Sequence, residues 1–92
     1  MAKYRKKPVV IDAWRVSDLI DIYNHGASDL PISVFEAHKR GEFSFFPNRV
    51  LVYTLEGDMQ GEPDDYIIRG VKGELYPCKP DVFKATYERV DD

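Results

Sequence analysis

Hydrophobic and polar residues change their spacing near position 42 of the chain. Before that point, a β-branched opening is followed by two stretches whose apolar residues have helical spacing. After it, apolar and polar residues alternate with a period of two. The first part therefore predicts a strand and two helices, and the second part predicts short strands joined by tight turns.

The first part contains one strand and two helices with recognisable ends. The strand is expected over residues 8–16, where valine and isoleucine favour an extended backbone. A helix is expected from Ser17, whose hydroxyl can cap the N-terminus, to His25, which precedes Gly26. A second helix is expected over 31–40, with proline in its first turn and cations in its last.

The second part contains two predicted hairpins. In the first hairpin, Pro47-Asn48-Arg49 is the loop, and in the second the glycines of Gly70-Val-Lys-Gly73 supply the positive φ of a tight reversal. The expected elements in chain order are strands 43–46, 50–55, 66–69 and 74–76, a helical turn over 80–85, and a last strand over 86–90.

These elements predict one α+β domain over residues 1–92, because a chain of 92 residues is too short to build two cores. An open sheet of five or six short strands would expose unpaired edges. We therefore expect a mainly antiparallel, strongly curved sheet or a small, partly open barrel, with two short helices packed on one side.

Charge and cysteine content narrow the classes of function. The net charge of −3 provides no basic field for duplex nucleic acid. No run reaches the roughly 18 apolar residues of a membrane span. The single cysteine, Cys78, is typical of a reducing cytoplasm, because small secreted domains usually carry several. The sequence predicts a cytoplasmic protein that binds neither duplex nucleic acid nor membrane.

Both ends of the chain resemble a widespread group of small bacteriophage and prophage proteins. The matching segments are Thr54-Leu-Glu-Gly-Asp-Met59, the run from Pro63 to Phe83, Thr86-Tyr-Glu88, and the opening from Lys3 to Trp14. The resemblance implies a phage accessory protein acting in the host bacterial cytoplasm, including counter-defence, and implies no established chemistry. Where the family has a glycine, this chain has Asp64, a residue type that tolerates the left-handed conformation of a turn.

Carboxylates concentrate between positions 56 and 65. Interrupting glycines and a proline favour a solvated loop, and the spacing lacks the regular oxygen positions of a calcium loop. The acidic residues are Glu56, Asp58, Glu62, Asp64 and Asp65.

The residues for catalysis are few. His25 and His38 have no partner at metal-ligand spacing, so no metal or cofactor is predicted. Cys78 precedes Lys79, a cation that could lower the thiol pKa, but a lone cysteine is more often a small buried filler. We therefore predict no catalytic residues.

The strongest candidate binding feature is the cationic turn that begins at Arg69. Glycines let backbone N–H groups approach a phosphate, while arginine and lysine supply charge. Tyrosines on the flanking strands could stack a base. The alternative is an ordinary hairpin connection surrounded by core aromatics. The candidate ligand-binding residues are Tyr66, Arg69, Gly70, Lys72, Gly73, Tyr76 and Lys79.

Three functions remain open. The first is a non-enzymatic binder that sequesters a small anionic ligand, such as a defence-signalling nucleotide, in a homo-oligomer with its pocket between subunits. The second is an interaction module that inhibits a host protein through the acidic segment and a strand edge. The third is an enzyme acting on nucleotides, built from Asp, Glu, Lys and Tyr around the single Cys78.

Overall fold

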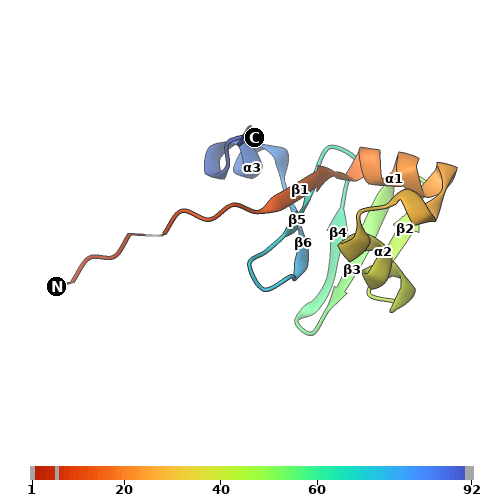
Figure 1. Ribbon diagram of the computed structural model, residues 1–92, viewed down its shortest axis with the longest axis horizontal. Coiled ribbons are helices and arrows are strands. Elements are labelled where there is room, and N and C mark those ends of the chain that lie inside the picture. The colour runs from red at the N-terminus through yellow and green to blue at the C-terminus, as the bar shows by residue number, and fades with distance from the viewer. Residues whose placement is uncertain (1, 6, 91–92) are drawn as a thin grey trace.

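The computed structural model describes residues 2–5 and 7–90, so the basic lead-in lies within the described residues except for Lys6. Seven residues or fewer separate successive elements (Figure 1). In chain order these are β1 (Asp12–Arg15), α1 (Val16–His25), the 3-10 helix η1 (Ala27–Asp29), α2 (Ile32–Lys39), β2 (Phe43–Phe46), β3 (Arg49–Thr54), β4 (Gly57–Gly61), β5 (Tyr66–Arg69), β6 (Leu75–Cys78) and α3 (Pro80–Thr86).

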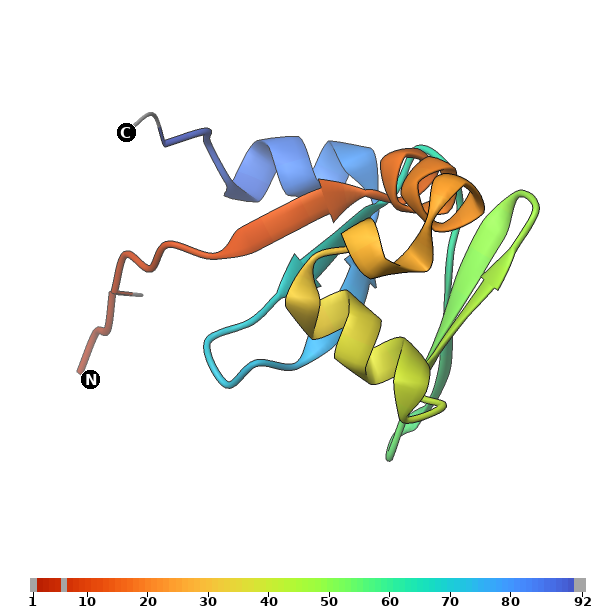
Figure 2. The same cartoon turned by 45° about the vertical axis from the view of Figure 1, so that its right-hand side comes forward.

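The strands form two antiparallel sheets of three strands each, in the orders β1-β5-β6 and β2-β3-β4. The α+β class is thus confirmed. The predicted single curved sheet is divided in two, and the described strands do not close into a barrel (Figure 2). The division leaves β4 and β6 each with one unpaired edge.

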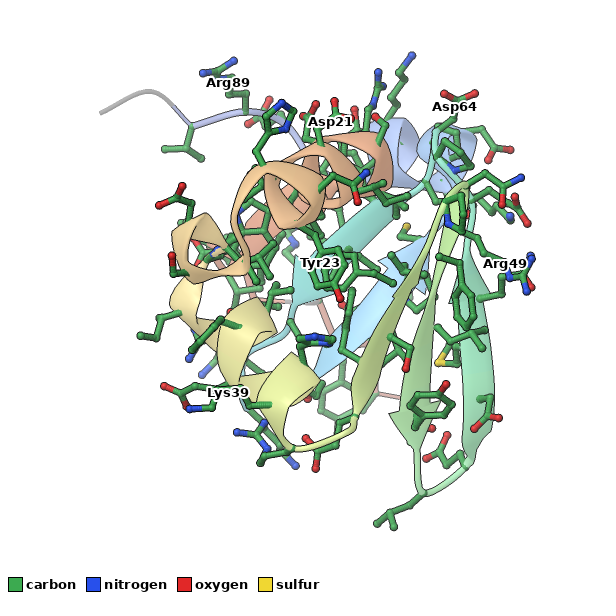
Figure 3. All side chains as sticks on the ribbon, turned by 90° about the vertical axis from the view of Figure 1, so that its right-hand side faces the viewer. Asp21, Tyr23, Lys39, Arg49, Asp64 and Arg89 are labelled. Atoms are coloured by element: carbon green, nitrogen blue, oxygen red, sulfur yellow. The ribbon has the colours of Figure 1, made fainter. Side chains whose placement is uncertain are left out.

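One hydrophobic core lies between the sheets and the first two helices. Helices α1 and α2 both contribute buried residues to it, as expected of helices on one side. Tyr23 is directed into the interior, whereas Arg49 and Asp64 project from the surface (Figure 3). The completely or almost completely buried side chains are Val16, Leu19, Val34, Phe43, Val50, Ile67 and Ile68.

Helix α3 lies on the opposite face of the first sheet and confirms the helical turn predicted over 80–85, apart from the two helices expected on one side. Ile67 belongs to the core, so strand alternation directs its neighbour Tyr66 to the other face. There the Tyr66 ring stacks on Phe83 of α3 with 3.9 Å between ring centroids. The first sheet is therefore covered on both faces.

Several local predictions are confirmed. The first hairpin pairs β2 with β3, although its loop has two residues instead of three because Arg49 already pairs with Phe46. Strand β5 has the predicted bounds, and β6 is shifted by one or two residues. The two central helices begin and end within one residue of their predicted bounds.

The strand predicted over 8–16 is confirmed only at Asp12–Arg15, and the predicted cap of the first helix is wrong. Strand β1 has only four residues, because its partner β5 offers only four for pairing. The helix begins at Val16, and no side chain caps it. Backbone carbonyls of Asp65 and Pro63 accept the N–H groups of Val16 and Ser17 at 2.9 and 3.1 Å instead.

The acidic segment is not a solvated loop, and residues 86–90 are not a strand. Gly57–Gly61 is strand β4, paired with β3, because Gly57 at φ +126° permits the tight turn before it. Asp64 lies in a turn as expected but has no positive φ. Helix α3 continues to Thr86, since the ring of Tyr87 contacts that of Phe83 one turn earlier.

Candidate functional site: the seam between the two sheets

The predicted ligand-binding residues are divided between the two ends of the first sheet. Arg69 and Leu75 form a cross-strand pair at the end of the first sheet where the Gly70–Gly73 turn lies. Tyr66 is at the opposite end of β5, and its ring contacts α3. Lys79 follows the far end of β6. The turn, the tyrosines and Lys79 do not form a common pocket.

Both tyrosines are engaged by neighbouring side chains. One ring face of Tyr66 stacks on Phe83, and its hydroxyl accepts a hydrogen bond from Arg15 at 3.0 Å. Tyr76 pairs with Ile68 on the same sheet face and hydrogen-bonds the side chain of Tyr87. Burial, together with that hydrogen bond, raises the pKa of Tyr76 to about 12. These rings hold α3 and the following segment on the sheet.

Lys79 is paired with a buried carboxylate. Its ammonium donates to Asp65 at 3.0 Å, and this hydrogen bond raises the lysine pKa. Asp65, only 3% exposed, also accepts the backbone N–H of Glu62 at 2.8 Å. Lys79 thus stabilises the turn that covers the start of α1.

The thiol of Cys78 is not activated. Burial raises its pKa, and the carboxylates of Asp65 and Asp81 raise it further. The adjacent Lys79 does not counter this effect, because its ammonium is bonded to Asp65. A nucleophilic cysteine needs a lowered pKa, so the surroundings of Cys78 disfavour thiolate chemistry.

The cationic turn does bind a carboxylate, and that carboxylate is its own Glu74. The Lys72 backbone N–H donates to the Glu74 side chain at 3.2 Å. The same side chain lies so close to Gly70 that a Cβ atom there would be 1.9 Å from its oxygen. Gly73 has the predicted positive φ, +84°, whereas Gly70 does not; Gly70 is required by the close approach of Glu74 instead. An external anion at this turn would have to displace Glu74.

The two sheets meet along their unpaired edges, and we name this line between β4 and β6 the seam. At one end the strands are in contact, because Gly61 carries no side chain. A Cβ atom there would lie 3.0 Å from Val50 Cγ2, 3.1 Å from Val16 Cγ2 and 3.6 Å from Pro77 Cβ. This closed end has room for no further atoms.

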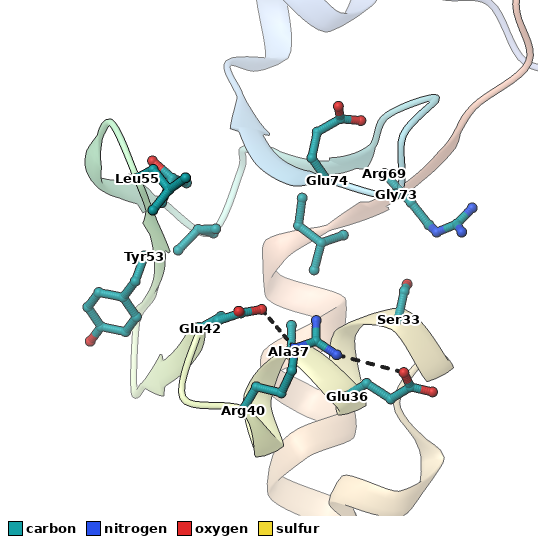
Figure 4. A pocket seen from close by; sticks show the side chains of 13 residues that line it. Ser33, Glu36, Ala37, Arg40, Glu42, Tyr53, Leu55, Arg69, Gly73 and Glu74 are labelled. Carbon is teal, nitrogen blue, oxygen red and sulfur yellow. Dashed lines mark hydrogen bonds and ion pairs between the residues drawn. The ribbon is translucent and has the colours of Figure 1, made fainter.

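Toward the other end the strands diverge (Figure 2). A groove of about 560 Å³ opens there between the hairpin tips, and Figure 4 shows the side chains that line it. One wall is the end of β3, the other is the start of β6 with Arg69, and α2 lies beneath. Figure 4 shows Tyr53 pointing away from this groove. The lining includes Ser33, Glu36, Ala37, Arg40, Glu42, Val52, Thr54, Leu55, Arg69, Gly73, Glu74 and Leu75.

The groove has an apolar floor and an acidic rim. Ala37 and Val52 are buried and Leu75 is half-buried, so hydrophobic atoms lie beneath the opening. Around them are three carboxylates, those of Glu36, Glu42 and Glu74, and two guanidinium groups. Two more carboxylates, Glu56 and Asp58, belong to the β3–β4 hairpin that forms one wall.

The cations in the groove are already paired. Arg40 lies 2.9 Å from a Glu42 oxygen and 3.8 Å from a Glu36 oxygen, as the dashed lines in Figure 4 show. Arg69 lies 4.0 Å from the Asp12 carboxylate at the start of β1. Three carboxylates against two guanidinium groups leave the lining with a net charge of −1, to which Glu56 and Asp58 of the neighbouring hairpin add and which the exposed Lys72 partly offsets.

Most groove residues were not recognised from the sequence. Arg69 and Gly73 are the two candidates that do line it. Leu55 is fully exposed at the hairpin tip and was placed at the end of a strand. The one available signal was an apolar residue directly before Glu56-Gly57, a pair that indicates a tight turn.

Comparison with protein-family models, with curated proteins and with solved structures found no match to this chain. Within residues 2–5 and 7–90, no helix has the length and apolar character needed to cross a membrane. Among those same residues, no three His, Cys, Asp or Glu side chains are grouped as metal ligands would be. The geometry of the seam carries the functional argument.

Proposed function

We propose that this chain is a non-enzymatic binding module of phage origin that holds an extended, basic segment of a partner protein in the seam. The observation that carries the proposal is an acidic groove between the end of β3 and the start of β6, in sheets whose outer strands β4 and β6 each have an unpaired edge. Extended peptides bind such edges by adding a strand, with side-chain pockets giving selectivity. A host protein captured in this way would be blocked at that segment.

The backbone arrangement supports strand addition. In β4 the first four residues are exposed and only Gly61 is buried. A segment paired with the free edge of β6 at Leu75 would lie over the groove, and the exposed part of β4 is the second edge along the seam. With both edges paired, the two sheets would join into the partly open barrel that the sequence predicts.

The charge distribution supports a basic occupant. Lysine or arginine in the added strand would face the rim carboxylates, while every second side chain would contact Ala37, Val52 and Leu75. Because the rim is exposed, this attraction is screened by salt. Affinity is therefore expected to fall as ionic strength rises.

The test uses the full chain and two synthetic peptides, (Lys-Val)4 and (Glu-Val)4. Titration followed by backbone NMR should show binding of the basic peptide, with shifts at Thr54, Leu55 and Leu75. Leu55→Ser should weaken binding at least tenfold, about 1.4 kcal/mol, because it removes an apolar contact without changing the charge. Val71→Ser is the matched control, because Val71 is 71% exposed in the neighbouring turn but does not line the groove. Equal weakening by both variants, or no shifts at millimolar peptide, would reject the proposal.

A second candidate is capture of a small anionic ligand such as a nucleotide. Its support is that Arg69 and Gly73 line a groove whose volume of about 560 Å³ is within the usual range for ligand pockets. The carboxylate of Glu74 in the turn opposes it. Calorimetry with linear and cyclic nucleotides separates the candidates, because heat that is lost in Arg69→Ala would favour ligand capture.

A further inference from the structure

The N-terminal arm, residues 2–5 and 7–11, has no helix or strand and extends away from the body of the molecule (Figures 1 and 2). Tyr4 is 95% exposed and Val10 is 78% exposed. In the sequence, four cations and no carboxylate precede Asp12: Lys3, Arg5, Lys6 and Lys7. The arm is thus an extended, basic segment with uncovered apolar side chains, which are typical of a contact surface.

The arm has the chemistry that the seam accepts. We propose that the arm of a second copy of this chain lies in the seam as an added strand, with Tyr4 on the apolar floor. Strand alternation then directs Lys3 and Arg5 to the opposite face of that strand, and their long, flexible side chains bend back toward the carboxylates at the rim. The inference rests on the seam being the binding site of the proposed function. Tyrosine is a frequent anchor in such contacts because it buries a large area with few torsions to fix.

The arm of a second copy fits the groove better than the arm of the same chain does. The arm begins at the groove rim, because Asp12 lies 4.0 Å from Arg69. To enter its own groove the arm must reverse direction, yet residues 1–11 contain no Gly, Asn or Asp, and Pro8 has a fixed φ. Two copies with their grooves facing one another can exchange arms without a reversal. The seven steps from residue 4 to residue 11 reach about 23 Å in extended form.

A cross-linking experiment tests the location of the arm. In a Cys78→Ser background, one preparation carries Tyr4→Cys and the other carries Leu55→Cys. Mixed under mild oxidation, they should form a disulfide-linked dimer of one chain of each kind. The matched control replaces Leu55→Cys by Val71→Cys and should give no more than background linkage. If a chain carrying both Tyr4→Cys and Leu55→Cys forms the disulfide within itself, the arm occupies its own groove and the inference is overturned.

The oligomeric state provides an independent readout. Native mass spectrometry and sedimentation of the unmodified full chain should show a dimer. Tyr4→Ala should weaken dimerisation at least tenfold, whereas Tyr4→Phe should retain it. Because Tyr4 is 95% exposed, the melting temperature measured at monomeric concentrations should not change in either variant. A chain that stays monomeric at millimolar concentration, or a dimer indifferent to Tyr4→Ala, contradicts the inference.

The outcomes also separate this inference from the proposed function. If (Lys-Val)4 binds a chain that is monomeric, the seam accepts basic segments and only the exchange of arms fails. If the link between positions 4 and 55 forms between chains but (Lys-Val)4 does not bind, recognition of foreign segments fails and self-association remains.

Discussion

The two ends of the seam are built from the same pair of strands but differ in what separates them. At the closed end, Gly61 lets β4 approach Pro77 and Val16, and the buried Asp65 fastens the adjoining turn. At the open end, the hairpin tips lie apart and charged side chains line the space between them. Missing side-chain volume thus lets the two sheets pack together, whereas an edge lined by solvated charge stays accessible.

The largest effect is expected from adding volume at the closed end. In Gly61→Ala, the new methyl group would lie 3.0 Å from Val50 and 3.1 Å from Val16, both fully buried. Overpacking of this kind should lower the free energy of unfolding by about 1–3 kcal/mol. Urea denaturation measures it. The neighbouring exposed Gln60→Ala is the control, and equal stability of the two variants would show that the seam is not packed at Gly61.

The buried carboxylate at the closed end should have the next largest effect. Asp65→Ala removes the acceptor of the Glu62 N–H and of the Lys79 ammonium. A hydrogen bond to a charged group contributes about 1.5–3 kcal/mol to the free energy of unfolding. A loss near the lower value is expected, because Lys79 can return to water. Thermal and urea unfolding measure the stability of Asp65→Ala, and Asp64→Ala, a variant of an exposed neighbour, is the control. A loss no greater than that of Asp64→Ala would contradict it.

At the open end, removal of charge should change binding more than stability. Glu74→Ala frees the Lys72 N–H, which is exposed, so the cost should be about 0.5–1.5 kcal/mol or less. The emptied turn should then accept inorganic phosphate at millimolar concentration, seen as NMR shifts at the Lys72 and Gly73 amides. Val71→Ala, in the same turn, should not gain this binding. If phosphate shifts the Lys72 and Gly73 amides of the unmodified protein equally, Glu74 does not compete with phosphate for the turn.

The smallest effect is expected at alkaline pH. The pKa of Tyr76 is about 12 in the folded chain and 10.0 ordinarily, so folding favours the protonated phenol. The contribution of Tyr76 to stability is complete below pH 10 and is lost as pH rises toward 12. The raised pKa of Lys79 changes stability in the same direction. Stability should therefore decline across this window, and less steeply in Tyr76→Phe. Identical slopes would contradict the role of Tyr76.

Local elements were predictable from local chemistry. Proline and glycine set the limits of α2, and alternation together with a turn identified the β2–β3 hairpin. Strand β4 was missed because its residues, Gly-Asp-Met-Gln-Gly, have low strand propensity and are ordered by pairing with β3. The last strand, predicted over 86–90, was wrong because the rings of Tyr66, Phe83 and Tyr87 hold this segment on the sheet, and the stacking of Phe83 on Tyr66 joins positions 17 residues apart.

The candidate site, like the packing of α3 on the first sheet, depends on contacts between residues that are distant in the sequence. The sequence by itself determined an α+β chain, a cationic glycine turn, an acidic segment and a basic lead-in. Only the tertiary structure decided that Glu74 fills the turn, that the tyrosines face α3, and that an acidic groove opens between two unpaired edges. Propensity and periodicity act over a few neighbours, whereas the volume at Gly61 and the pairing of distant charges depend on which strands meet in space.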